Sequence, residues 1–129
     1  MAEARPNLRG ARVLIVDDHA DTLAILREVL PFCGASPLVA QSAREAVPLL
    51  DSADVVVTDL AMPEHDGVWL LGHVRRLPRR VPVVAVTGYT ATQQPVLADA
   101  GFDRVLLKPV DPLALCEVIE SVLGGESRA

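Results

Sequence analysis

The sequence predicts an α/β domain in which one parallel sheet lies between two layers of helices. Short apolar runs rich in β-branched residues alternate along the chain with segments of helical periodicity. The runs are apolar throughout, which is typical of strands that helices cover on both faces. The intervening segments are long enough for the right-handed crossovers that join parallel strands. The pattern therefore indicates a doubly wound fold of five strand–helix units.

Five apolar runs are expected to form the strands. They cover residues 13–16, 36–40, 55–58, 81–87 and 105–107. Valine is frequent in most of them, and β-branched side chains pack well on a pleated surface. The run at 36–40 is the weakest of the five.

Four segments between these runs are predicted to be helices, at residues 21–32, 42–50, 66–77 and 111–125. The first places Leu23, Leu26 and Leu30 at helical spacing. The second opens with Ser42 and Glu45, which are spaced as a capping box.

The third predicted helix has Asp66 as its N-cap and is expected to bury Val68, Leu71 and Val74. This assignment rests on the spacing of the apolar residues along one face.

The last predicted helix has Asp111 as its N-cap and Pro112 in its first turn, and it is expected to stop at Gly124. Prolines limit two other segments. Pro48 interrupts the second helix, and Pro95 leaves about one and a half turns for a further helix between residues 90 and 101.

Length and composition predict one domain, residues 1–129, with an ordered core from about 11 to 124. No apolar run approaches the roughly 20 residues of a membrane span, and the chain has no apolar stretch before Val13, unlike a secretory signal. We therefore expect a cytoplasmic protein. Cys33 and Cys116 form no metal-binding pattern and are interpreted as reduced, packed thiols.

The net charge of −5 argues against binding to a nucleic acid backbone, which requires clustered Lys and Arg. The one basic cluster, at residues 75–80, is interpreted as a solvated helix end and turn. We therefore expect neither direct nucleic acid binding nor membrane association.

Polar residues are predicted at the carboxyl ends of four strands, the edge where parallel sheets bind ligands. They are Asp17, Asp18, Asp59, Thr87 and Lys108. Each has a structural explanation when taken alone, such as a helix cap or a turn. Their convergence on one edge instead predicts a functional site.

The three carboxylates predict a cation site, because close like charges raise one another's pKa unless a cation neutralises them. Hard oxygen ligands favour Mg²⁺, which commonly has a phosphate partner. Lys108 carries a compact charge that suits a carboxylate or a phosphoryl oxygen, and the Thr87 hydroxyl can donate to another such oxygen.

Four sequence elements together resemble the receiver domain of two-component response regulators. They are VLIVDD, DLAMPEHDG in the pattern D-x-x-M-P-x-x-D-G, VTG and LLKP. In this order and spacing they are highly specific, and the resemblance runs from about Val13 to Leu123. It implies a flavodoxin-like (βα)5 fold with strand order 2-1-3-4-5.

The resemblance implies that Asp59 accepts a phosphoryl group from a phosphohistidine of a histidine kinase or a histidine phosphotransfer protein. Thr87 and Lys108 would bind the phosphoryl oxygens. Such a domain carries at most self-phosphorylation and self-dephosphorylation activity and is not an enzyme otherwise.

The same resemblance implies a Mg²⁺ site formed by Asp18, Asp59 and the main-chain carbonyl of Ala61, with Asp17 acting through water. Catalysis would come from in-line positioning and charge neutralisation, because a carboxylate is a poor nucleophile towards an anionic donor.

Two departures from the family concern signal output. Val105 stands where receivers commonly carry Tyr or Phe, and Val110 replaces the usual Phe after Lys-Pro. The aromatic half of the usual switch is therefore missing.

Two further residues predict slow dephosphorylation. Tyr89 could block the water that attacks the phosphoryl group, and Ala61 offers this water no polar group. We therefore expect slower dephosphorylation than in a Tyr89→Ala variant.

Other classes of function remain open at this point. A haloacid dehalogenase-type phosphatase requires a second Asp two residues after the nucleophile, where this chain has Ala61. A flavodoxin-like flavin protein requires a phosphate loop after the first strand. Within the receiver class, output by protein contact competes with a phosphate sink or a relay receiver from a hybrid histidine kinase, which the segment GFDRVLLKPVD resembles.

Overall fold

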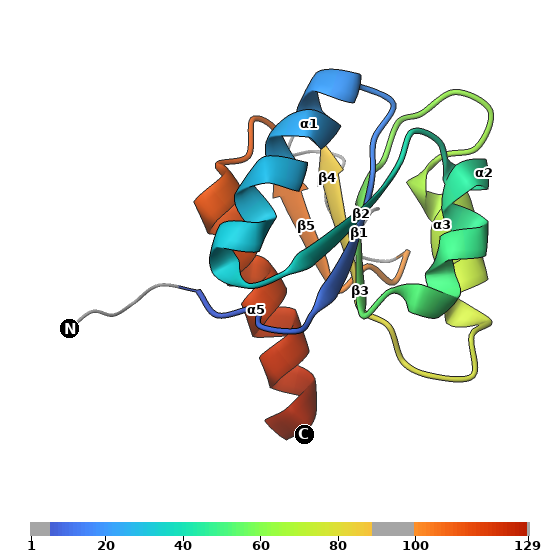
Figure 1. Ribbon diagram of the computed structural model, residues 1–129. Coiled ribbons are helices and arrows are strands. Elements are labelled where there is room, and N and C mark those ends of the chain that lie inside the picture. Colours follow the sequence, from blue (N-terminus) through green and yellow to red (C-terminus); the bar gives the residue numbers. More distant parts are fainter. Residues whose placement is uncertain (1–5, 89–99, 129) are drawn as a thin grey trace.

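A computed structural model describes residues 6–88 and 100–128, with the side chains of residues up to 124 (Figure 1). Most of the segment expected to form a helix between residues 90 and 101, together with Tyr89, lies outside this range. Among the described residues, every helix is too short or too polar to cross a bilayer.

The sheet has five parallel strands in the order β2-β1-β3-β4-β5, as the family resemblance implied. Their bounds are β1 Arg12–Val16, β2 Ser36–Ala40, β3 Val55–Asp59, β4 Val83–Thr87 and β5 Arg104–Leu107. Strand β4 begins two residues later than predicted, after Pro82, which has no N–H to donate to a neighbouring strand. Strand β3 extends to Asp59, so an acidic residue ends a fully buried strand.

The first helical segment is confirmed as α1, Ala20–Val29, and its last turn tightens into the 3-10 helix η1, Leu30–Cys33. Leu23 and Leu26 are buried as predicted, and so is Leu30.

The second segment is helical but differs from the prediction, since only Ala43–Ala46 form an α-helix, α2, before the 3-10 helix η2, Val47–Ser52. Pro48 has no N–H, and its ring excludes a regular turn, which explains the change. The predicted cap is present, because Ser42 Oγ accepts a hydrogen bond of 3.1 Å from the main-chain N–H of Glu45.

Helix α3, Gly67–Arg75, begins after Asp66, whose carboxylate accepts a hydrogen bond of 2.9 Å from the N–H of Trp69. This confirms the predicted N-cap. The predicted burial of Val68 is wrong, because Val68 is 43% exposed and Leu70 points into the core instead. The apolar face of α3 therefore includes Leu70 in place of Val68.

Helix α5, Pro112–Arg128, begins after Asp111, whose carboxylate accepts a hydrogen bond of 3.0 Å from the N–H of Ala114. The predicted stop at Gly124 is wrong, since the helix continues to Arg128. Glycine lowers helix stability by only about 1 kcal/mol and does not forbid the helical conformation.

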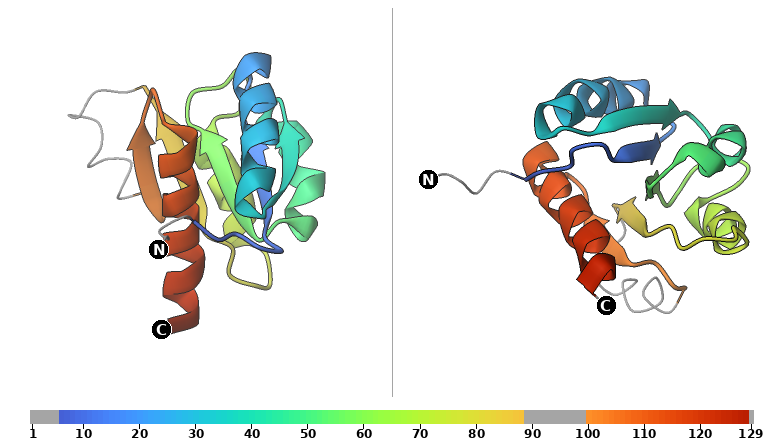
Figure 2. Two further views of the ribbon diagram at one scale, coloured as in Figure 1. Left: turned by 60° about the vertical axis from the view of Figure 1, so that its left-hand side comes forward. Right: turned by 60° about the horizontal axis from the view of Figure 1, so that its bottom comes forward.

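Helices α1 and α5 cover one face of the sheet, and α2 and α3 cover the other (Figure 2). The side chains of β1 alternate between the two cores. Val13 and Ile15 pack under α1 and α5, whereas Leu14 and Val16 pack under α2 and α3. All four are at most 1% exposed, so β1 lies between the two cores and contributes side chains to both.

The packed region begins before β1, earlier than the expected boundary near residue 11. Leu8 is 2% exposed, and its N–H donates a hydrogen bond of 2.7 Å to the carbonyl of Cys33. Cys33 and Cys116 are free and buried in the same core. The prediction of two reduced, packed thiols is confirmed.

Candidate functional site

Two acidic side chains meet at the carboxyl edge of the sheet because they follow neighbouring parallel strands. Strands β1 and β3 pair with Val16 opposite Thr58, so Asp17 and Asp59 come next at the same level. Asp17 is 4% exposed and Asp59 is 6% exposed. The sheet register alone therefore places two buried carboxylates side by side.

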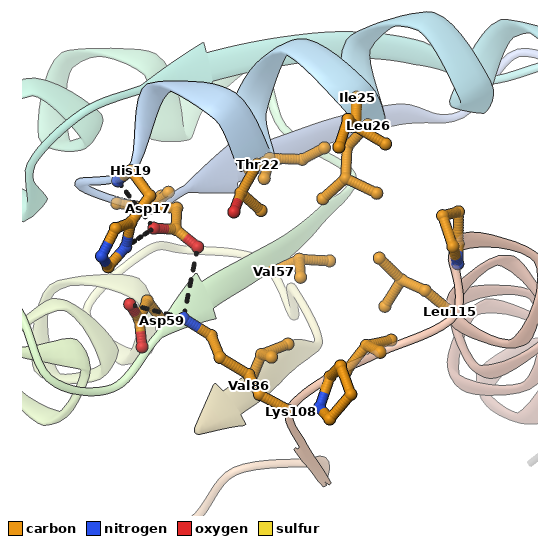
Figure 3. Close-up of a pocket in the computed structure, with 15 residues that line it drawn as sticks. Asp17, His19, Thr22, Ile25, Leu26, Val57, Asp59, Val86, Lys108 and Leu115 are labelled. Carbon is orange, nitrogen blue, oxygen red and sulfur yellow. Dashed lines mark hydrogen bonds and ion pairs between the residues drawn. The ribbon is translucent and has the colours of Figure 1, made fainter. Parts of the chain in front are cut away.

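Lys108 reaches these carboxylates from β5, across β4. Its main-chain N–H donates a hydrogen bond of 2.9 Å to the carbonyl of Thr87, which fixes the backbone beside the site. Its Nζ atom lies 3.1 Å from Asp59 Oδ2 and 3.7 Å from Asp17 Oδ2 (Figure 3). The ammonium group thus bridges the two buried acids.

Burial raises the pKa of Asp59, and the charges of Asp17 and Asp18 raise it further, whereas the hydrogen bond and charge of Lys108 oppose the rise. Burial lowers the pKa of Lys108, but its hydrogen bond to Asp59 and the three carboxylate charges outweigh burial, so its pKa is raised. Lys108 is therefore a cation at neutral pH, and it offsets only part of the negative charge.

A third carboxylate, Asp18, leaves one buried atom unsatisfied. Its side chain is 29% exposed, yet its Oδ1 atom is buried and has no hydrogen-bond partner. Ligand atoms from Asp17, Asp18, His19 and Asp59 all lie within 4.8 Å of one another. A buried carboxylate oxygen that accepts no hydrogen bond is unfavourable, and a divalent cation would satisfy it. The residues present therefore fit a cation site.

Two further predicted site residues lie at or after the ends of strands of the same sheet. Thr87 ends β4 and is 1% exposed, and Ala61 is exposed in the loop after β3. That loop returns to the end of β3, because the Gly67 N–H donates a hydrogen bond of 2.9 Å to the Leu60 carbonyl. A Cβ atom added at Gly67 would lie 2.9 Å from the Asp59 carbonyl oxygen, so this close approach requires glycine.

The acidic centre opens into a cavity of about 680 Å³ between α1 and the start of α5. Figure 3 shows Asp17, Asp59 and Lys108 at one end, and Ile25, Leu26 and Leu115 at the other. The far end is apolar, although Ile25 is 54% exposed. A charged site and an apolar surface are therefore continuous.

His19 belongs to this site, and the sequence reasoning missed it. Its main-chain N–H donates a hydrogen bond of 2.8 Å to Asp17 Oδ1, and its Nδ1 atom lies 3.0 Å from the same oxygen. The hydrogen bond with Asp17 raises the pKa of His19, and the charge of Asp18 adds to this. The available signal was its position directly after Asp17 and Asp18.

Comparison with known proteins identifies the family. The family model of the response regulator receiver domain matches residues 13–120. The chain belongs to this family. The receiver domain is thus a signalling domain of two-component systems, and its family and fold favour this function over a phosphatase or a flavin protein.

The receiver domain is similar to an uncharacterized 14.6 kDa protein of Leptolyngbya boryana, with 42% identity over 113 residues, covering 84% of this chain and 86% of the relative. The chain spans only 27%, 44% and 49% of the length of three further curated relatives.

Two solved structures are also similar. A CheY-like receiver domain protein of Methanospirillum hungatei JF-1 has a TM-score of 0.82 and 29% identity, covering 92% of this chain and 97% of that one. The receiver domain of a signal transduction histidine kinase of Syntrophus aciditrophicus has a TM-score of 0.81 and 27% identity, covering 93% and 95%.

Proposed function

We propose that this receiver domain, spanning residues 1–129, accepts a phosphoryl group on Asp59 in a Mg²⁺-dependent reaction. The donor is a phosphohistidine of a histidine kinase or a histidine phosphotransfer protein. The observation that carries this proposal is the ion pair of 3.1 Å between Asp59 Oδ2 and Lys108 Nζ beside two further carboxylates. A buried carboxylate with a bridging ammonium group suits the transfer of an anionic group.

Asp59 is the nucleophile in this reaction. One of its carboxylate oxygens forms a bond to phosphorus while the bond from phosphorus to the donor imidazole nitrogen breaks. Lys108 and Thr87 hold the phosphoryl oxygens, Lys108 by its charge and Thr87 by its hydroxyl. Phosphoryl transfer requires mainly positioning and charge neutralisation, and the rigid strand ends supply both.

Asp18, Asp59 and the main-chain carbonyl of Ala61 would hold Mg²⁺, and Asp17 would contribute through water. The bound ion would neutralise the acceptor carboxylate and the phosphoryl oxygens. The Oδ1 atom of Asp18, which is buried and accepts no hydrogen bond, supports this assignment.

The apolar end of the cavity provides a surface for the donor protein beside the acceptor. Ile25 is exposed there and lines the cavity together with Leu26 and Leu115, and contiguous apolar surface rimmed by polar residues commonly marks a contact site. We propose that output also occurs through protein–protein contact rather than nucleic acid binding. The alternative is a phosphate sink or relay receiver of a hybrid kinase; a receiver domain of a histidine kinase is among the similar structures, but the response regulator family and relatives favour the main proposal. The cytoplasmic location stays a prediction.

The proposal is tested by incubating the protein with a small-molecule phosphodonor and Mg²⁺ and measuring its intact mass. The wild type should gain the mass of one phosphoryl group, and Asp59→Asn should gain none. Asp51→Asn, which alters an exposed Asp outside the site, should behave as the wild type. Absence of the gain in the wild type, or an equal gain in Asp59→Asn, would overturn the proposal.

A further inference from the structure

His19 adds a nitrogen ligand to a site that otherwise consists of oxygen atoms. We infer that His19 determines metal specificity here, so that His19, Asp17 and Asp18 together bind first-row transition ions such as Ni²⁺ and Zn²⁺ in addition to Mg²⁺. The inference rests on the cation site of the proposed function and concerns which ions that site selects.

The distances from His19 match those between adjacent ligands of one ion. Its Nδ1 atom lies 3.0 Å from Asp17 Oδ1 and 3.3 Å from Asp18 Oδ1. With metal–ligand bonds of about 2.1 Å, neighbouring ligand atoms are about 3.0 Å apart in octahedral coordination and about 3.4 Å apart in tetrahedral coordination. Coordination therefore requires little movement of the three side chains, and an ion that binds Nδ1 displaces the proton that Nδ1 shares with Asp17, which is released to solvent.

The backbone holds the imidazole in this place. His19 is the N-cap residue of α1, and its carbonyl accepts a hydrogen bond of 3.3 Å from the N–H of Leu23. Its own N–H is bound to Asp17 Oδ1 at 2.8 Å. The side chain is 64% exposed, so an ion can approach the Nδ1 atom from solvent.

Lys108 and His19 contact different oxygen atoms of the carboxylates. Lys108 contacts the Oδ2 atoms of Asp17 and Asp59, whereas His19 lies against the Oδ1 atoms of Asp17 and Asp18. Asp18 Oδ1 is buried without a hydrogen bond, although His19 Nδ1 is near it. His19 Nδ1, at 3.3 Å, therefore lies beside a buried carboxylate oxygen that can take a further partner such as a cation.

The chemistry of the ligands determines which ions benefit. Mg²⁺ takes oxygen ligands and retains water, so an imidazole contributes little to its binding. Neutral imidazole favours Ni²⁺, Cu²⁺ and Zn²⁺, which also bind more strongly to mixed nitrogen and oxygen sites than Mn²⁺ does. Removal of His19 should therefore weaken binding of transition ions selectively.

The test is calorimetric titration of the wild type, His19→Asn and His73→Asn with Ni²⁺ and, separately, with Mg²⁺. Asn at position 19 retains a polar side chain but removes the imidazole nitrogen. His73, which packs against Trp69 on α3, controls for adventitious binding to a histidine. We expect His19→Asn to bind Ni²⁺ at least about tenfold more weakly, with Mg²⁺ affinity within about twofold, and His73→Asn to match the wild type.

Equal Ni²⁺ affinity in the wild type and His19→Asn would overturn the inference, and so would a parallel loss of Mg²⁺ affinity. The first result would show that His19 does not contribute to metal binding, and the second that its effect does not select between ions. Phosphoryl gain with Mg²⁺, measured by mass on the wild type, separates this failure from failure of the proposed function. If the wild type gains a phosphoryl group while Ni²⁺ affinity does not depend on His19, only this inference fails.

Discussion

The Nζ atom of Lys108 lies 3.1 Å from Asp59 Oδ2, although the two residues are 49 positions apart in the sequence. Lys108 is the only lysine of the chain, and all its other Lys or Arg residues are arginines. This pair joins the end of β3 to the end of β5. It also brings the only lysine ammonium group of the chain to the buried Asp59 carboxylate.

Replacing Lys108 by Met should slow phosphoryl acceptance by Asp59 by about 100-fold or more, a typical effect of losing one preorganised charge partner in an active site. The measurement is the rate of mass gain with a small-molecule phosphodonor and Mg²⁺. Lys108→Arg should retain part of the rate, since it keeps the charge but replaces a compact ammonium group with a planar guanidinium group. Wild-type rates in Lys108→Met would show that Lys108 does not act on the phosphoryl group.

Asp59→Asn should stabilise the fold at neutral pH without Mg²⁺. Burial and the charges of Asp17 and Asp18 raise the pKa of Asp59, so its ionised form destabilises the folded state at pH values above that pKa. The midpoint of urea unfolding should therefore rise while the slope stays unchanged. Asp51→Asn should differ from the wild type by no more than about 0.5 kcal/mol. Addition of Mg²⁺ should narrow the difference, because the ion stabilises the wild-type carboxylates.

Cys116 should make stability depend on alkaline pH. Burial and the hydrogen bond with Cys33 raise its pKa from 9.0 to about 12. A pKa that is higher in the folded state provides stability below pH 9.0, and this stability is lost as pH rises from 9.0 towards 12. The free energy of unfolding should fall by roughly 1.4 kcal/mol for each pH unit in this window.

The comparison with Cys116→Ala isolates this effect from other groups that titrate in alkali. The variant should be less stable than the wild type at pH 8, because it leaves a cavity in the core. The difference in free energy of unfolding between wild type and variant should shrink at about pH 11, since the variant has no thiol at position 116 to ionise. A constant difference across this range would mean that Cys116 is not the titrating group.

The fold and most of the site could be predicted because both depend on short-range patterns. Apolar runs determine the strands, and the parallel order brings their ends together, so Asp17, Asp59 and Lys108 meet as expected. The wrong predictions of buried residues arise where the spacing of apolar residues fits more than one face of a helix. Val68 and Leu70 are both apolar in the first turns of α3, and only packing against the sheet decides which of them is buried.

Other differences depend on contacts between distant segments. Arg79 was interpreted as part of a solvated turn, but its guanidinium group donates hydrogen bonds of 2.9 Å to the carbonyls of Leu50, Asp51 and Ala53. His19 was missed because its role appears only when its side chain is placed against Asp17. The slow dephosphorylation attributed to Tyr89 stays a prediction, since that residue lies outside the described range.

Substitution of Gly67 tests whether the loop after Asp59 must approach the acceptor strand closely. An alanine Cβ there would lie 2.9 Å from the Asp59 carbonyl oxygen, so Gly67→Ala should destabilise the protein by about 1–3 kcal/mol and slow phosphoryl acceptance by displacing Asp59. Gly72→Ala is the matched control on the same helix, because its Cβ would meet no atom within 4 Å. It should stabilise the protein by roughly 0.5–1 kcal/mol and leave the acceptance rate unchanged. Equal effects of the two substitutions on unfolding midpoint and rate would mean that the loop tolerates a side chain beside the acceptor.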